Sequence, residues 1–148
     1  MTSPPPLLRI AASPFDAHLL ATFSSDSPLI RILDVRQPGQ ALLELRGHGA
    51  PVNCIEWSNT QRGVLSSGAD DCCVLLWDLV NSVGGGQPVA PGGVPGGTGQ
   101  ERGPSASWEC GFEVGNISWA PPLGGRQGES GMGTVGVAGG RGFWGVQL

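Results

Sequence analysis

Charged side chains are scarce in this sequence, and it contains no basic cluster. Asp, Glu, Lys and Arg together make up 14% of the 148 residues, and the formal net charge is −4 at pH 7. Phosphate backbones attract proteins that gather several Lys or Arg side chains in one patch. The composition therefore argues against direct binding of nucleic acid.

A long apolar run is also missing. A membrane-spanning helix needs about 20 consecutive apolar residues, and no segment approaches that length. The first ten residues, MTSPPPLLRI, contain three consecutive prolines and no apolar stretch like that of a signal peptide. We therefore expect a soluble protein of the cytoplasm and nucleus, with no membrane partner.

The four cysteines lack the spacing of a metal site. No pair is separated by the two residues of a C-x-x-C motif, which zinc sites commonly use. Cys72 and Cys73 are adjacent and would point to opposite faces of a strand. With Cys54 and Cys110, we expect them to be reduced packing residues, as suits a reducing compartment. We expect no metal and no cofactor.

No useful stretch shows the periodicity of an amphipathic helix. Short runs of Val, Leu and Ile alternate instead with turn residues, a pattern that predicts strands. Glycine (26 residues) and proline (13 residues) reach the level of a disordered chain or a loop-rich all-β fold. The expected strands are residues 7–12, 19–23, 29–34, 41–45, 52–57, 64–67, 73–79, 107–111, 116–119, 134–138 and 143–148.

Two stretches of the chain repeat one pattern. Residues 20–34 read LATFSSDSPLIRILD, and residues 64–78 read VLSSGADDCCVLLWD. Each has an apolar strand, a small-residue stretch, an Asp turn, a second apolar strand and a closing Asp. The closing residues, Asp34 and Asp78, are 44 positions apart. That spacing falls within the period of roughly 40–45 residues known for one class of four-stranded repeat.

A third, weaker copy follows after an insertion. VNCIEW at 52–57 and VGNISW at 114–119 share an outline but lie 62 positions apart. Between them, residues 84–103 contain nine glycines and almost no apolar bulk. Such a segment cannot bury enough surface to offset its ordering entropy, so we expect a disordered loop. A second Gly-rich stretch, residues 121–133, interrupts the third copy.

The central unit carries a recognisable signature. Gly47-His48 and Trp77-Asp78 are separated by 28 residues and bracket three expected strands. This stretch resembles the WD40 repeat, whose signature is such a Gly-His and Trp-Asp pair. A fully satisfied buried polar network specifies one packing, and losing one member strands the others. The resemblance implies a structural tetrad of four hydrogen-bonded side chains: His48, Ser67, Asp71 and Trp77.

His48 beside Asp71 could instead suggest a catalytic dyad. Ser67 would then be the nucleophile, but the repeat would bury it, and no oxyanion-hole motif accompanies it. We therefore interpret the group as structural and expect no enzymatic activity.

The outer two units depart from the signature. In the first, Leu33 occupies the Trp position, and Thr22 and Asp26 match only if the turn has one extra residue. In the third, Glu109-Cys110 stands where Gly-His is expected. We therefore expect one intact tetrad.

A finer resemblance comes from four short segments. They are similar to the carboxy-terminal third of a WD-repeat family that comprises the plant transparent-testa-glabra and anthocyanin-regulating proteins and their animal counterparts. The resemblance covers roughly residues 7–80 and 107–148. It implies a seven-bladed propeller without enzymatic activity, whose members bind transcription factors or protein kinases and some of which are substrate receptors of cullin-RING ubiquitin ligases. The segments are ILDVR (32–36), VNCIEW (52–57), ADDCCVLLWD (69–78) and ISWA (117–120).

Substrate receptors of this kind often carry a W-D-x-R box that the ligase adaptor reads. Leu33-Asp34-Val35-Arg36 resembles that box, with Leu in place of Trp. The alternative is that Asp34 caps a turn and Arg36 is solvated.

Taken together, the sequence predicts an all-β protein, a partial WD40 β-propeller of about two full blades and a three-stranded remnant. We expect a disordered N-terminus (1–6), blades (7–80), a Gly/Pro-rich disordered loop (81–106), and a segment that completes the second blade and forms the last partial one (107–148). The expected function is a non-enzymatic scaffold for protein–protein interaction. A ubiquitin-ligase substrate receptor and a non-functional truncated propeller are the alternatives. Because propellers usually have 4–8 blades, we expect exposed blade faces and marginal stability for this chain alone.

Overall fold

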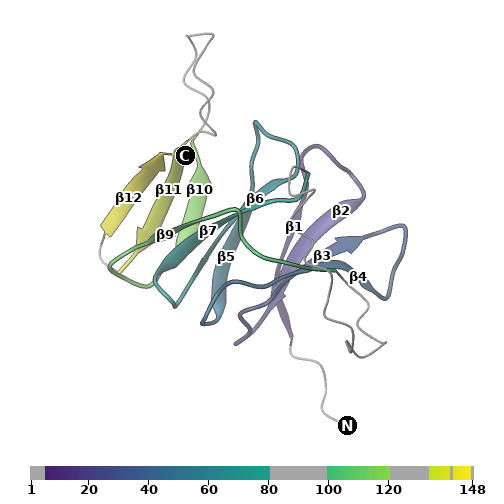
Figure 1. The fold of residues 1–148 in the computed structure, drawn as a ribbon, viewed down its shortest axis with the longest axis horizontal. Coiled ribbons are helices and arrows are strands. Elements are labelled where there is room, and N and C mark those ends of the chain that lie inside the picture. Colours follow the sequence, from purple (N-terminus) through teal and green to yellow (C-terminus); the bar gives the residue numbers. More distant parts are fainter. Residues whose placement is uncertain (1–5, 81–99, 121–133, 141, 148) are drawn as a thin grey trace.

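The computed structural model describes residues 6–80, 100–120, 134–140 and 142–147 (Figure 1). Within these ranges the chain forms twelve β-strands in three sheets. All eleven predicted strands are present, with ends within two residues of the prediction. The described residues contain no helix that is long and apolar enough to cross a membrane.

The first sheet is a meander of four antiparallel strands with a fifth strand at its edge. Neighbouring strands follow the chain order, and the fifth strand, β8, runs parallel to β4. The strands are β1 (Leu7–Ala12), β2 (Leu19–Ser24), β3 (Ile30–Asp34), β4 (Ala41–Leu45) and β8 (Gln100–Arg102).

Strand β8 was not predicted, because it falls in the range 81–106 that we expected to be a disordered loop. Residues 81–99 lie outside the described residues, but residues 100–102 pair with β4. The Arg46 amide donates to the Arg102 carbonyl at 2.9 Å, and the Arg46 guanidinium lies 2.8 Å from the Glu101 carboxylate. The segment QER has none of the β-branched or aromatic residues that favour strands. Pairing with the open edge of β4 therefore makes it a strand.

The second and third sheets are antiparallel throughout. The second has the order β5-β6-β7-β9 and the third the order β10-β11-β12. The second sheet consists of β5 (Val52–Trp57), β6 (Val64–Ala69), β7 (Cys73–Asp78) and β9 (Ala106–Glu109). The third sheet consists of β10 (Asn116–Trp119), β11 (Thr134–Gly139) and β12 (Gly142–Gln147).

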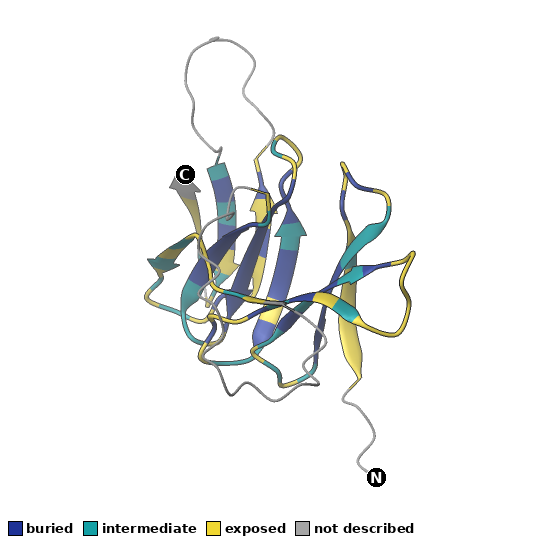
Figure 2. Cartoon of the chain, turned by 45° about the vertical axis from the view of Figure 1, so that its right-hand side comes forward, coloured by how far each residue is buried: buried dark blue, intermediate teal, exposed yellow. Residues whose placement is uncertain are grey.

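The three sheets stand side by side as consecutive blades, and the apolar core lies between them (Figures 1 and 2). Strand β7 shows why: Leu75 and Trp77 pack toward the first sheet, whereas Val74 and Leu76 pack toward the third. A strand buried on both faces reads as a continuous apolar run instead of an alternating one. The prediction of an all-β, partial β-propeller is confirmed.

One face of the first sheet carries exposed apolar side chains. Leu8 and Ile10 on β1 are 60% and 58% exposed, and Leu42 on β4 is 43% exposed. Figure 2 shows β1 exposed along most of its length, in contrast to the buried strands of the second sheet. The second sheet is covered on both faces by its neighbours. Among the described residues, no segment covers these side chains of the first sheet in the same way.

Gly68 on β6 packs against Val114, which lies in the segment that leads into the third sheet. A Cβ atom at this position would overlap the Val114 side chain and lie 2.9 Å from the Cys54 sulfur. Overpacking of a core commonly costs about 1–3 kcal/mol. We expect Gly68→Ala to lower the free energy of unfolding in urea by that amount. Gly111→Ala, whose added methyl meets no atom within 4 Å, is the control, and an equal effect of the two changes would contradict the prediction.

Candidate functional site: the tetrad, the pocket and the adaptor box

The structure brings the four tetrad residues together. His48 lies in the segment between β4 and β5, Ser67 on β6, Asp71 in the β6–β7 turn and Trp77 on β7. The His48 Nδ1 atom lies 2.9 Å from Asp71 Oδ2, and its Nε2 atom lies 2.7 Å from Ser67 Oγ. Trp77 Nε1 lies 2.8 Å from the same Ser67 oxygen. The four side chains form one continuous hydrogen-bond chain.

The hydrogen bonds of the tetrad run in a defined donor-to-acceptor direction. The indole N–H can only donate, so Ser67 Oγ accepts from Trp77. The Ser67 hydroxyl proton is then directed at His48 Nε2, and His48 Nδ1–H donates to Asp71. This arrangement suits a neutral imidazole. Burial lowers the pKa of His48, and this effect exceeds the opposing influence of the Asp71 carboxylate.

The Asp71 carboxylate also organises the turn in which it lies. Burial alone would raise its pKa, but hydrogen bonds from the Gly49 amide and His48 hold the pKa below its usual value. The Gly49 N–H donates to Oδ2 at 2.9 Å, and the Cys73 N–H donates to Oδ1 at 3.0 Å. Cys72, which lies between Asp71 and Cys73, has a positive φ of 63°. Asp71 therefore holds the turn and the imidazole at once.

This geometry gives the dyad-like group no access to a substrate. The Ser67 side chain is fully buried, with 0% exposed, and its oxygen has two partners. A serine nucleophile must reach a substrate carbonyl that lies near oxyanion-stabilising donors. Ser67 cannot do so without dismantling the hydrogen-bond chain.

The described residues of the first sheet form no hydrogen-bonded tetrad. Thr22, at the Ser67-equivalent position, donates to the Arg9 carbonyl at 2.7 Å. Asp26 lies in the β2–β3 turn with a positive φ of 56°, and Leu33 replaces the tryptophan with a half-buried apolar side chain. The first sheet therefore keeps the strand pattern but not the polar network.

Two tryptophans join neighbouring sheets. The Trp57 indole on β5 donates to the Ala11 carbonyl on β1 at 2.9 Å, and the Trp119 indole on β10 donates to the Glu56 carbonyl on β5 at 3.2 Å. Both tryptophans are buried at the junctions between sheets, each with 6% exposed. The acceptors were not predicted, because no sequence signal identifies a backbone carbonyl.

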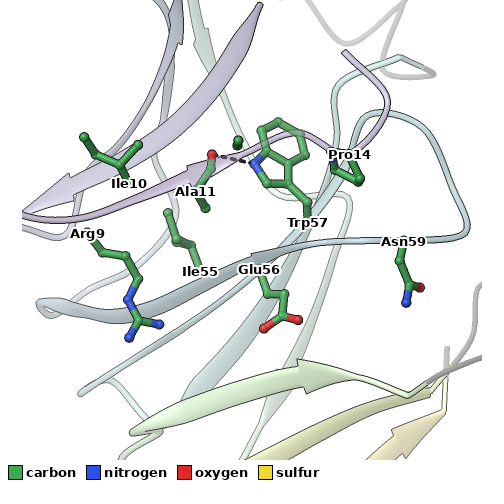
Figure 3. Close-up of a pocket in the computed structure, with 9 residues that line it drawn as sticks. Arg9, Ile10, Ala11, Pro14, Ile55, Glu56, Trp57 and Asn59 are labelled. Atoms are coloured by element: carbon green, nitrogen blue, oxygen red, sulfur yellow. Dashed lines mark hydrogen bonds between the residues drawn. The ribbon is translucent and has the colours of Figure 1, made fainter. Parts of the chain in front are cut away.

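An open pocket of about 410 Å³ lies between β1 and β5 (Figure 3). The Trp57 indole and the Ala11 carbonyl close one side, and the Arg9 and Glu56 side chains point from the two strands to the same side of the pocket. Burial raises the pKa of Glu56. Nothing in the sequence indicates this pocket, because β1 and β5 become neighbours only in the folded chain. Its lining residues are Arg9, Ile10, Ala11, Ala12, Pro14, Ile55, Glu56, Trp57 and Asn59.

The candidate adaptor box, Leu33-Asp34-Val35-Arg36, forms the end of β3 and the following turn. The buried Asp34 carboxylate accepts the Arg36 amide at 2.9 Å, and the guanidinium through Nε at 3.0 Å and Nη2 at 2.7 Å. These contacts with Arg36, the side-chain contacts first, lower the pKa of Asp34 to about 2. The Arg36 side chain is 67% exposed, and Val35 is 52% exposed. The carboxylate thus caps the turn and holds an exposed guanidinium.

The second sheet has the complementary half of the motif. Asp78 follows Trp77, and its carboxylate accepts the Val80 amide at 3.1 Å, as Asp34 accepts that of Arg36. Val80 stands where the first sheet has Arg36. The first turn therefore has the Arg without the Trp, and the second has the Trp without the Arg.

Across the described ranges, no three His, Cys, Asp or Glu side chains are grouped so that they could hold a metal ion. The four cysteines are free thiols. Two further tryptophans lie on β9 and β12. Trp108 is half-buried and packs on the side of the third sheet, and Trp144 stacks on Phe112 with ring centroids 3.7 Å apart.

Comparison with protein families identifies the central unit. Residues 39–78 match the family described as WD domain, G-beta repeat. The matched range contains the whole tetrad and strands β5, β6 and β7. The chain carries a WD40 repeat. Proteins built from WD40 repeats are generally non-enzymatic scaffolds.

Two of the similar proteins are named for their WD repeats. A WD repeat-containing protein of Saccharomyces cerevisiae is 54% identical over 76 residues, which are 51% of this chain and 14% of that protein. A WD repeat-containing protein of Schizosaccharomyces pombe is 34% identical over 155 residues, covering 80% of this chain and 34% of that protein. The DDB1- and CUL4-associated factor 7 homolog of Dictyostelium discoideum is 39% identical over 74 residues, covering 50% of this chain and 23% of that protein. The chain spans about a third or less of the length of these relatives.

The WD40 tetrad is testable through its central hydroxyl. Ser67→Ala removes the acceptor of Trp77 Nε1 and the donor to His48 Nε2. A buried polar group left without a partner costs about 1–3 kcal/mol. We expect the free energy of unfolding in urea to fall by about 2–4 kcal/mol. Ser107→Ala, at an exposed position on β9, should leave it nearly unchanged, and equal effects would contradict the role assigned to Ser67.

The lowered pKa of His48 predicts a pH dependence of stability. In the unfolded chain a histidine takes up a proton near pH 6.5 (about the reference value), whereas folded His48 takes it up at lower pH. Between these values the unfolded state binds more protons, so stability falls as pH is lowered, by at most about 1.4 kcal/mol per pH unit. We expect the stability difference between wild type and His48→Asn to shrink from about pH 7.5 to about pH 5.5 in urea titrations. Parallel curves would contradict this.

Proposed function

We propose that this chain is part of a non-enzymatic WD-repeat scaffold that binds other proteins. The observation that carries the proposal is the closed tetrad. This group, which resembles a catalytic arrangement, is buried inside the second sheet, and its side chains are hydrogen-bonded to one another. The polar chemistry of the repeat is thus used to hold the blade together. The turns between the strands, including the exposed one at Arg36, remain to contact partners.

The partners that we propose are transcription factors or protein kinases, in the cytoplasm and nucleus. The support is the resemblance of four short segments to the transparent-testa-glabra type of WD-repeat protein. Neither direct nucleic-acid binding nor membrane binding is part of the proposal, because the chain has few charges and a net charge of −4.

A second candidate is a substrate receptor of a cullin-RING ubiquitin ligase. The specific support is the Arg36 guanidinium, which Asp34 holds at the surface through two nitrogens. A guanidinium fixed in this way loses little freedom on binding. One similar protein is named a DDB1- and CUL4-associated factor 7 homolog. We therefore propose DDB1 as the adaptor that would bind at residues 33–36.

Affinity capture with three forms of the tagged chain separates these functions. The forms are wild type, Arg36→Ala and Arg46→Ala, the last as a matched control because Arg46 is also exposed and paired with a carboxylate. If the receptor function holds, we expect Arg36→Ala to reduce the free energy of binding to DDB1 by about 1–3 kcal/mol. This is a roughly 5- to 150-fold weaker affinity. The binding constant to purified DDB1 is then measured for each form.

The scaffold proposal has its own outcome in the same experiment. Transcription factors or kinases that are retained by all three forms support a scaffold independent of Arg36. DDB1 lost from the Arg36→Ala sample alone supports the receptor. Recovery of chaperones alone, with no other protein in any sample, would contradict both functions for this chain.

A further inference from the structure

Two cysteines from distant parts of the chain lie opposite each other at one end of the second sheet. In the pairing of β7 with β9, Cys73 lies opposite Glu109. The next position outward places Cys72 opposite Cys110. Both residues lie just beyond the last strand pair, and the Cys110 amide donates to the Cys72 carbonyl at 2.6 Å, which holds the two backbones side by side.

This placement suits a disulfide. Antiparallel residues joined by backbone hydrogen bonds have Cα atoms about 5.5 Å apart. Disulfides join residues with Cα atoms about 4.4–6.8 Å apart. Cys72 and Cys110 are both half-buried free thiols, so a small reagent can reach them.

The neighbouring cysteines are placed less well. Cys73 packs against the core between the first and second sheets, and its sulfur lies 3.5 Å from the Asp71 carbonyl. Cys110 packs against the opposite core, between the second and third sheets. Cys54 is buried, with 1% exposed, and burial raises the pKa of its thiol to about 12. The thiolate is the reactive form of cysteine, so Cys54 is the least reactive of these thiols.

Electrostatics indicates the same proximity. Burial, and secondly the charge of the Cys72 thiolate, raise the pKa of Cys110. The Cys110 thiol therefore lies near Cys72, as a thiol–disulfide exchange between the two residues requires.

We propose that Cys72 and Cys110 form an oxidative modification site that reacts with low-molecular-weight disulfides such as glutathione disulfide. One cysteine thiolate attacks a sulfur of the reagent, releases one glutathione thiol and forms a mixed disulfide. The second thiolate attacks the protein sulfur of that mixed disulfide and releases the second glutathione thiol. Two protein thiols are oxidised to one intrachain disulfide, and one reagent disulfide is reduced to two thiols.

The bond would fix the turn that carries the tetrad carboxylate. Cys72 follows Asp71, whose carboxylate holds His48 at 2.9 Å. Residues 72 and 110 enclose a long stretch of chain, and closing such a stretch stabilises the folded state by constraining the unfolded one. Oxidation therefore ties the turn to the segment after β9 and favours the state in which the tetrad is assembled.

The test treats the full chain with glutathione disulfide under native conditions and records intact mass and free thiols by alkylation. We expect wild type to lose the mass of two hydrogen atoms and two alkylatable thiols, and its melting temperature to rise by several degrees. Cys73→Ser and Cys54→Ser should behave as wild type does. Cys72→Ser and Cys110→Ser should each retain a glutathione adduct and form no intrachain bond.

Peptide mapping keeps the result independent of how the serine variants fold. In the Cys73→Ser chain, a cross-linked peptide pair that joins residues 72 and 110 supports the proposal. An intrachain disulfide that persists in Cys72→Ser, or one that joins other cysteines, would overturn it. So would stable mixed disulfides on wild type with no loss of the reagent from the protein.

Discussion

The hydroxyl of Ser67 is the point on which the second sheet depends. It is buried, accepts the Trp77 indole proton and donates to His48, which in turn donates to Asp71. One oxygen thus links β6, β7 and the segment that enters β5. Inside a medium of low polarity each of these hydrogen bonds is strong, and each unpaired member is costly. The chain of bonds therefore forms as a whole and selects one arrangement of three separate segments.

The contacts between sheets follow a second repeated rule. Apolar side chains fill the two cores, and one indole at each junction donates to the first strand of the preceding sheet. Trp57 and Trp119 make this contact to the carbonyls of Ala11 and Glu56. The apolar contact is non-directional, whereas the indole bond has a defined length and direction. Together they fix both the distance between the sheets and their register.

Because the polar groups of the repeat hold the blade together, the binding that we propose is left to the turns and to the pocket between β1 and β5. The Arg36 guanidinium stands at the surface but is held by a buried carboxylate, so it is ordered before any partner arrives. The pocket between β1 and β5 is lined by Arg9, Glu56 and the Trp57 indole. Both features are suited to recognising another protein, since interfaces combine ordered arginines and aromatic surface with a polar rim.

The sequence by itself determined the strands and the residues of the tetrad. Apolar runs between turn residues are local signals, and the spacing from His48 to Trp77 lies within one repeat. Strand β8, the pocket at Arg9 and the pairing of Cys72 with Cys110 were decided by tertiary structure. The segment QER carries no strand pattern and becomes a strand because the edge of β4 is open. The two cysteines meet because β9 returns to β7 after the insertion. Local patterns determine which residues extend and which turn, but only the pairing of distant segments determines which side chains meet.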